Sequence, residues 1–375
     1  MKILLTGGGS GGHFYPLIAV AESLREQARN EKLLDPEIYY MGPEKYDATV
    51  LSDNGIIFKK TSAGKLRRYL SFLNLVDVFK TCWGIIGAVI EVYSIYPDVV
   101  FAKGGYASFP ALFAAWLFRI PVVIHESDSV PGRLNSWAGK FARRIAVSYP
   151  EAVAYFPKGK VAYTGNPIRK EIVRPMSNGA HEFLRLEQDV PVIVVMGGSQ
   201  GAQLINEVLI DALPELLNDF QIIHQTGKKN FEHVRGMVDV VAGKHQFKNR
   251  YHPVDYFNDL ALKMAVGISE TIISRAGSTI FEIAAWGVPA VIIPITDSNG
   301  DHQRKNAYNY ARTGAAIVIE EGNLSAPILT SELRRLHADS TARESMKSAA
   351  LGFAKLDASE KIARAIIEIG LEHEA

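Results

Sequence analysis

The chain of 375 residues carries the same local pattern twice, about half a chain apart. In the first copy an aliphatic run at residues 3–5 precedes a glycine-rich segment at 7–12, and apolar residues then follow at helical spacing through Leu17 and Leu24. In the second copy the apolar run 192–196 precedes the glycine-rich segment 197–201 and another amphipathic stretch. Each copy is typical of the strand, glycine loop and helix of a nucleotide-binding domain. The repetition predicts two Rossmann-like domains in tandem.

Further apolar runs lie at residues 99–101, 122–124, 272–274 and 291–293, with longer helical stretches between them. Strands that are apolar throughout indicate an α/β protein, with parallel sheets covered by helices on both faces. Glycine and proline interrupt the pattern at 163–169, so we expect domains at 1–165 and 166–352 and a C-terminal helix, about 353–375, that packs back on the first domain. Ligands bind at the carboxyl ends of such strands, which predicts two sheets facing an interdomain cleft.

Composition excludes several classes of protein. The 41 basic and 40 acidic residues give a net charge of +1, which provides no field for nucleic acid, and no nucleic-acid partner is expected. Cys82 is the only cysteine, so no internal disulfide can form; its apolar neighbours predict a buried thiol and a reducing compartment. The first residues do not resemble a secretory signal, and the longest apolar run, 81–90, is shorter than the roughly 20 residues of a spanning helix.

The first glycine segment has the spacing of a dinucleotide-binding loop, with glycines at 7, 9 and 12. Such a loop brings backbone N–H groups close to a diphosphate at a helix N-terminus. A nicotinamide or flavin site also needs an acidic residue at the end of the second strand, but the strand expected at 38–41 ends in Gly42 and Pro43. The sequence therefore favours a diphosphate ligand that is not part of a redox cofactor.

The second glycine segment matches the nucleophile elbow of α/β-hydrolases, Gly197-x-Ser199-x-Gly201. A hydrolase needs a downstream acid and then a histidine, whereas His302 with Asp297 or Asp301 has the wrong order or lies crowded in one loop. Ser199 is better interpreted as a hydroxyl that donates to phosphate beside free helix N–H groups.

The sequence contains no Walker A motif and no metal-binding motif. Neither His125-Glu126 nor His181-Glu182 is followed by a second histidine at the required spacing, and no Asp-x-Asp pair occurs. No metal or organic cofactor is expected. Helix N-termini, hydroxyl groups and arginine would then neutralise the charge of a departing diphosphate.

Seven short motifs occur in one order along the chain. They are GGSGGHFYP at 8–16, GGYAS at 104–108, HESD at 125–128 with Pro131-Gly132, GNPIR at 165–169, GGSQGA at 197–202, RAGS at 275–278 leading to Glu282, and DHQRKNA at 301–307. Together they resemble the MurG family of peptidoglycan N-acetylglucosaminyltransferases, over Lys2 to about Gly314.

The resemblance implies a GT-B fold, with the lipid acceptor on the first domain and the nucleotide sugar on the second. It implies metal-independent, inverting transfer of N-acetylglucosamine from UDP-N-acetylglucosamine to the C4 hydroxyl of undecaprenyl-diphospho-N-acetylmuramoyl-pentapeptide (lipid I), which forms lipid II. Two alternatives remain open: a related GT-B transferase with another lipid acceptor, and a UDP-N-acetylglucosamine 2-epimerase.

The resemblance also assigns roles to residues. His13 is the expected general base, or the group that orients the acceptor hydroxyl, because a neutral imidazole is available near pH 7. Asp128 stands where many members have asparagine, and the segment 275–282 is one residue shorter than the usual pattern. The expected substrate-binding residues are Ser10, Gly11, Gly12, Asp128, Arg169, Ser199, Phe257, Ser278, Thr279, Glu282, His302 and Gln303.

A lipid acceptor requires contact with a bilayer. The segment 65–73 combines Lys65, Arg67 and Arg68 with a tyrosine, a phenylalanine and leucines, a composition typical of an interfacial contact. We therefore expect an anionic membrane surface as a partner and a peripheral location on the cytoplasmic face of the plasma membrane.

Overall fold

The computed structural model describes residues 1–64, 72–197, 202–296 and 298–374. The chain divides into two compact units, one formed by Met1–Arg169 with Lys355–Ala375 and the other by Lys170–Ala354. Each unit contains one sheet in which all strand pairs are parallel. The prediction of two Rossmann-like α/β domains is confirmed.

The sheet of the first unit has seven strands in the order β3-β2-β1-β4-β5-β6-β7. The strand order reverses between β1 and β4, so a ligand crevice is expected at the carboxyl ends of these two neighbours. The strands are β1 (Lys2–Thr6), β2 (Glu37–Gly42), β3 (Ile57–Lys60), β4 (Val99–Ala102), β5 (Val122–Glu126), β6 (Arg144–Val147) and β7 (Val161–Tyr163).

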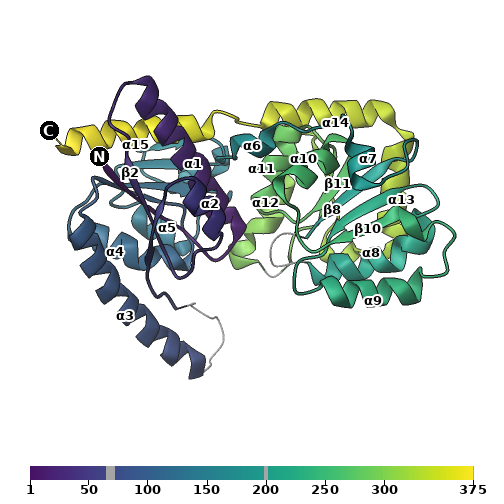
Figure 1. The fold of residues 1–375 in the computed structure, drawn as a ribbon, viewed down its shortest axis with the longest axis horizontal. Coiled ribbons are helices and arrows are strands. Elements are labelled where there is room, and N and C mark those ends of the chain that lie inside the picture. Colours follow the sequence, from purple (N-terminus) through teal and green to yellow (C-terminus); the bar gives the residue numbers. More distant parts are fainter. Residues whose placement is uncertain (65–71, 198–201, 297, 375) are drawn as a thin grey trace. The chain divides into compact units, whose positions relative to one another are not determined.

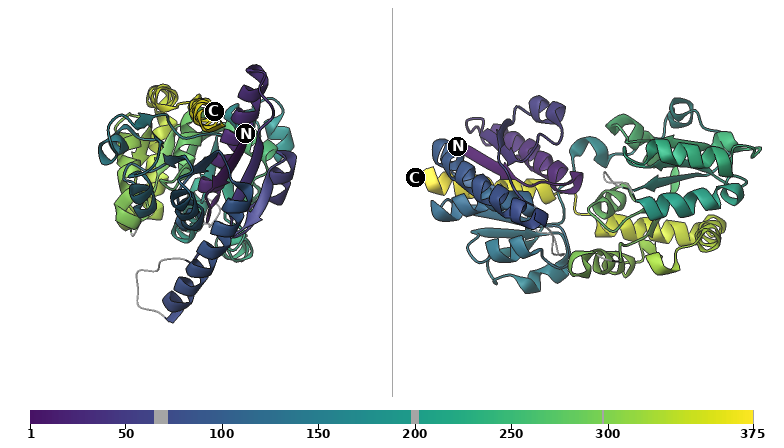
Figure 2. Two further views of the ribbon diagram at one scale, coloured as in Figure 1. Left: turned by 90° about the vertical axis from the view of Figure 1, so that its left-hand side faces the viewer. Right: turned by 90° about the horizontal axis from the view of Figure 1, so that it is seen from below.

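Helices cover both faces of this sheet, because alternate residues of each strand point to opposite sides. Ile3 and Leu5 of β1 join the apolar cluster under the first and last helices of the chain, whereas Leu4 joins the cluster on the other face. Figures 1 and 2 show the last helix running beside the first. The helices are α1 (Gly11–Asn30), α2 (Ala48–Asp53), α3 (Phe72–Ile95), α4 (Phe109–Leu117), α5 (Arg133–Ala138) and α15 (Ala358–Glu374), with 3₁₀ turns η1 (Tyr106–Ser108) and η2 (Pro150–Tyr155).

The sheet of the second unit has six strands in the order β10-β9-β8-β11-β12-β13, and its order reverses between β8 and β11. Its apolar residues pack under helices on both faces, with α8, α9 and α13 on one side (Figure 1). The strands are β8 (Val192–Met196), β9 (Gln221–Gln225), β10 (Tyr251–Val254), β11 (Ser269–Ser274), β12 (Ala290–Ile292) and β13 (Ala316–Val318).

The helices of the second unit are α6 (Lys170–Val173), α7 (Ala180–Leu184), α8 (Gln203–Leu216), α9 (Phe231–Val241), α10 (Asp259–Gly267), α11 (Thr279–Trp286), α12 (His302–Ala311), α13 (Ala326–Ala338) and α14 (Ser340–Phe353). Its 3₁₀ turns are η3 (Lys248–Arg250), η4 (Asn299–Asp301) and η5 (Glu321–Asn323).

One expectation about the first unit is wrong. Cys82 is exposed on α3 rather than buried. The apolar run around it forms a long helix, and one side of that helix, including Trp83, Ile86 and Ile90, is not covered by the unit. An apolar run in a sequence therefore did not identify a buried element here.

Candidate active site

Two glycine turns meet at the carboxyl ends of β1 and β4. Ser10 precedes α1, and its Oγ lies 3.0 Å from Nδ1 of His13 in the first turn of that helix. Gly105, at φ +79°, comes so close that a β-carbon there would lie 3.0 Å from the carbonyl oxygen of Gly8 and 3.5 Å from Nε2 of His13. Only glycine fits this position. The close approach places the Nε2 edge of the His13 imidazole against the turn that contains Gly105.

A buried polar network lies directly behind this second turn. Lys103 follows β4, and only 1% of its surface is exposed. Its Nζ lies 2.6 Å from Nδ1 of His125 on the neighbouring strand β5 and donates to Oδ1 of Asn166 at 2.8 Å. Nε2 of His125 lies 3.0 Å from the carbonyl oxygen of Gly165, so Nε2 donates to it while Nδ1 accepts from the lysine. The network joins the ends of β4 and β5 to the segment that leaves the first unit.

Burial governs the ionisation of this network. It lowers the pKa of Lys103, although the carboxylates of Glu126 and Asp128 act in the opposite direction. It also holds the pKa of His125 well below its ordinary value, and the lysine adds to this effect. His125 is therefore neutral, as its hydrogen bonds require.

Glu126 shapes the loop that carries Asp128. Its Oε1 accepts the backbone N–H of Asp128 at 2.9 Å, and its Oε2 accepts from Gly132 N at 3.0 Å and from Asn135 Nδ2 at 2.9 Å. Burial raises the pKa of Glu126, and these three donors oppose the rise. Glu126 thus fixes the loop, and the partly exposed Asp128 stands at its start near the positive charge of Lys103.

Arg169 is the last residue of the N-terminal segment of the first unit. Its guanidinium lies over the ring of Tyr15, 4.2 Å from the ring centroid, and the residue is 6% exposed. An arginine stacked on an aromatic face in this way is held in one orientation. The structure therefore places Arg169 against α1, the helix that begins with Gly11 and Gly12.

In the second unit, Phe257 lies beside the end of β9. It is buried, and its backbone N–H donates to Oε1 of Gln225 at 3.3 Å. Next to Gln225, His224 is held by Tyr251 Oη at 2.8 Å and Asn206 Oδ1 at 3.0 Å. Burial lowers the pKa of His224 to about 3, which makes it a neutral structural residue.

The remaining predicted residues lie at the starts of α11 and α12. Ser278 precedes α11, Thr279 is its first residue, and Glu282 stands in its first turn, all three partly exposed. His302 begins α12, and Oε1 of Gln303 accepts the backbone N–H of Ile295 at 3.1 Å.

Both helices follow strands of the same sheet, so their N-termini lie at its ligand-binding edge. Ser199 and the segment 65–71 lie outside the described residues.

The comparisons with known proteins cover both units. Residues 3–147 match the glycosyltransferase family 28 N-terminal domain, and residues 192–362 match the glycosyltransferase family 28 C-terminal domain. The chain belongs to glycosyltransferase family 28. The family resemblance inferred from the sequence motifs and the predicted class of enzyme, a glycosyltransferase, are confirmed.

Two relatives within this family are similar along most of their length. One is the UDP-N-acetylglucosamine--N-acetylmuramyl-(pentapeptide) pyrophosphoryl-undecaprenol N-acetylglucosamine transferase 2 of Bacillus cereus, 37% identical over 90% of this chain and 91% of the relative. The transferase of Pediococcus pentosaceus named for the same donor and acceptor is 34% identical over 96% of this chain and 98% of its own.

Solved structures confirm the GT-B architecture of this family 28 member. The crystal structure of Acinetobacter baumannii MurG aligns with a TM-score of 0.71 and 25% identity, over 98% of this chain and 99% of that chain. A structure described as a UDP-N-acetylglucosamine 2-epimerase of Listeria monocytogenes gives a TM-score of 0.72 over 99% of this chain and 96% of that chain, at 16% identity. The second likeness shows the shared fold alone.

Several residues of the site escaped the sequence interpretation. Lys103 belongs to none of the seven motifs, although a lysine at the end of an otherwise apolar strand is itself a signal of a buried polar contact. Asn166 belongs to the motif at 165–169, but the motif does not show that it is a partner of that lysine. Glu321, which forms an ion pair with Arg275 at 2.6 Å and accepts the backbone N–H of Thr296 at 2.8 Å, has no local signal, because both partners lie in loops that follow other strands.

Proposed function

We propose that this chain transfers N-acetylglucosamine from UDP-N-acetylglucosamine to the N-acetylmuramoyl-pentapeptide on undecaprenyl diphosphate, forming lipid II from lipid I. The observation that carries the proposal is 37% identity, over nine-tenths of the chain, to a transferase named for that donor and acceptor. An epimerase has only a fold-level likeness in its favour.

The second unit would bind the donor. Glu282 offers two carboxylate oxygens to the two hydroxyl groups of the ribose. The N–H of Phe257 is already bonded to Gln225, so its carbonyl oxygen is the backbone group left to accept from N3–H of uracil. Ser278 and Thr279 would donate to the diphosphate from the start of α11, and Ser199 is expected to donate to it as well.

The sugar of the donor would lie near α12. Oε1 of Gln303 is engaged by the N–H of Ile295, so the Nε2 group is the part of this side chain that can donate to a sugar hydroxyl. His302, beside it, would contact the same sugar. Asp128 and Arg169, which lie in the first unit, would act on the sugar and on the diphosphate charge respectively.

The first unit would bind the acceptor and carry the base. A diphosphate would lie against Ser10, Gly11 and Gly12, where the N-terminus of α1 provides free N–H groups. When Nδ1 of His13 donates its proton to Oγ of Ser10, Nε2 carries the lone pair of the neutral ring and is the atom that would accept a proton.

The reaction would be a single displacement at the anomeric carbon of the donor. The C4 oxygen of the acceptor forms a bond to the anomeric carbon of the donor and gives its proton to Nε2 of His13. The bond from that carbon to the diphosphate oxygen breaks on the opposite face, so the configuration inverts and UDP leaves. Helix N-termini and hydroxyl donors stabilise the charge on the departing diphosphate.

Attachment to the membrane would use an uncovered side of α3. Trp83 is 74% exposed, and Ile86, Ile90 and Tyr93 follow at helical spacing on the same helix. Exposed tryptophan, tyrosine and isoleucine on one helix face suit the boundary between headgroups and acyl chains. No described helix is long and apolar enough to cross a membrane. We propose peripheral binding to the cytoplasmic face of the plasma membrane.

Vesicle binding tests this attachment. The double variant Trp83→Ser, Ile90→Ser should bind anionic phospholipid vesicles at least ~10-fold more weakly, because two apolar side chains no longer leave water. Its turnover of a water-soluble acceptor analogue should not change. Val240→Ser, at an exposed apolar residue of the second unit, is the control. Undiminished vesicle binding by the double variant would show that this face is not the contact.

Acceptor dependence tests the proposed reaction. Purified protein with labelled UDP-N-acetylglucosamine should release UDP only when lipid I is added, and the label should move into the lipid fraction. Epimerised nucleotide sugar in the absence of lipid would instead identify an epimerase. Transfer to another polyprenyl lipid, with none to lipid I, would identify a related transferase.

A further inference from the structure

Glu321 uses both of its carboxylate oxygens within the second unit. Oε1 lies 2.6 Å from Nη1 of Arg275, and Oε2 accepts the backbone N–H of Thr296 at 2.8 Å. The Arg275 and Glu321 side chains are only 14% and 18% exposed. An ion pair this well covered, with a hydrogen bond on each carboxylate oxygen, is held more firmly than a surface pair.

The two partners of Glu321 belong to two different loops. Arg275 directly follows β11 and starts the loop that leads to Ser278 and α11. Thr296 lies in the loop between β12 and α12. Nη1 of Arg275 also donates to the carbonyl oxygen of Ile293 at 3.1 Å, at the start of that second loop. One carboxylate at the end of β13 therefore connects the ends of three neighbouring strands.

These two loops carry the residues assigned to the donor. The first loop sets the start of α11, where Glu282 would hold the ribose, and the second sets the start of α12, where Gln303 would hold the sugar. Gln303 is itself fixed by the N–H of Ile295, the residue next to Thr296. A shift of one loop relative to the other would thus change the distance between the two ends of the nucleotide-sugar site.

We propose that Glu321 is a positioning residue of the donor site, which sets the spacing between the loop after β11 and the loop after β12. The inference rests on the proposed function, because it takes Glu282 and Gln303 as donor ligands. Glu321 itself does not contact the donor in this account.

The ionisation of Glu321 agrees with this role. Burial alone would raise its pKa, but the N–H of Thr296 and the guanidinium of Arg275 outweigh burial and hold the pKa below its usual value. The carboxylate is therefore charged at neutral pH and keeps both contacts.

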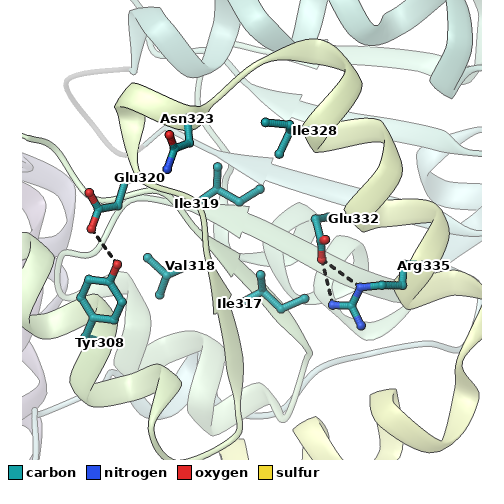
Figure 3. A pocket seen from close by; sticks show the side chains of 9 residues that line it. All are labelled: Tyr308, Ile317, Val318, Ile319, Glu320, Asn323, Ile328, Glu332 and Arg335. Carbon is teal, nitrogen blue, oxygen red and sulfur yellow. Dashed lines mark hydrogen bonds and ion pairs between the residues drawn. The ribbon is translucent and has the colours of Figure 1, made fainter.

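The preceding residue provides a matched control. Glu320 carries the same charge, but its carboxylate accepts from Tyr308 Oη at 2.6 Å and from Arg304 Nε at 3.0 Å. Figure 3 shows Glu320 with Tyr308 at the rim of a cavity beside β13, a cavity that contains none of the predicted donor ligands. Replacing Glu320 removes a carboxylate from the same turn, but its partners Arg304 and Tyr308 lie on α12 and not in either loop.

The experiment compares Glu321→Ala and Glu321→Gln with Glu320→Gln in the full chain. UDP-N-acetylglucosamine binding is measured by calorimetry, and kcat and KM are measured for each substrate. Loss of a charged hydrogen-bond acceptor should weaken donor binding by ~10-fold or more in Glu321→Ala. The KM for the donor should rise in parallel while the KM for the lipid acceptor stays unchanged. Glu321→Gln, which still accepts from Thr296, should lie between, and Glu320→Gln should remain within about twofold of the parent.

Each outcome decides the proposal. Unchanged donor affinity in the folded Glu321→Ala protein would overturn it, and so would equal losses for donor and acceptor. If both Glu321 variants fail to fold, as judged by thermal unfolding, the residue is structural and the inference is wrong. A parent protein that does not bind UDP-N-acetylglucosamine at all would instead overturn the proposed function.

Discussion

Removing the buried amino group of Lys103 should destabilise the first unit. Methionine has a similar length and fits an apolar site, but it cannot donate to Nδ1 of His125 or Oδ1 of Asn166, which receive the ammonium at 2.6 and 2.8 Å. Two buried acceptors would lose their partners, at about 1–3 kcal/mol each. Relief from burying the ammonium offsets part of this cost, so we expect Lys103→Met to lower the free energy of unfolding by roughly 2 kcal/mol.

The pH dependence of stability gives a second signature of the same variant. The pKa of Lys103 is lower in the folded chain than its ordinary value of 10.5, because burial penalises the charge. In the alkaline range below 10.5 the unfolded chain therefore binds more protons at this residue, so its contribution to stability rises with pH. This part of the rise should be absent from Lys103→Met.

Urea unfolding followed by circular dichroism at pH 7 and at pH 9.5 measures both effects. Lys158→Met, at an exposed lysine of the same unit, is the control and should match the parent at both values. A Lys103→Met protein as stable as the parent at pH 7, or one whose stability changes with pH as steeply as that of the parent, would contradict these roles of the buried amino group.

Three further outcomes are expected. His13→Ala should lower kcat at saturating substrates by ~10²–10⁴-fold and leave the donor KM unchanged, and near-normal turnover would exclude the base assignment. Gly165→Ala should lower the free energy of unfolding more than Gly159→Ala does. Both positions have positive φ, but a β-carbon at 165 would lie 2.3 Å from Cβ of Lys355, whereas one at 159 would face open space. His224→Gln should lose less stability than the parent between pH 6.5 and 4. In the parent, His224 has a pKa of about 3 when folded, so in this range the unfolded chain binds more protons at this residue and stability falls with pH. Equal acid sensitivity of variant and parent in denaturant titrations would contradict this.

The fold could be predicted because its signals are local. The run at 192–196 and the glycines that follow identify a strand and a ligand loop without knowledge of any other segment. Parallel pairing follows from strands that are apolar on both faces. The same local argument failed at Cys82, since one exposed side of α3 is as apolar as its covered side.

The candidate site was only partly accessible to such reasoning. Residues that lie in glycine loops or at helix starts, such as His13 and Glu282, were named from their motifs. The partners of Lys103 and Glu321 were not, because the register of neighbouring strands brings them together from separate segments. The stacking of Arg169 on Tyr15 likewise depends on where the chain leaves β7.

The linkage of the sugar in the reaction product tests the central claim most directly. The account predicts that nuclear magnetic resonance of the purified disaccharide lipid will show N-acetylglucosamine in β configuration on the C4 oxygen of N-acetylmuramic acid. An α linkage would contradict single inverting displacement with His13 as base, and attachment at any other oxygen would contradict the proposed acceptor geometry.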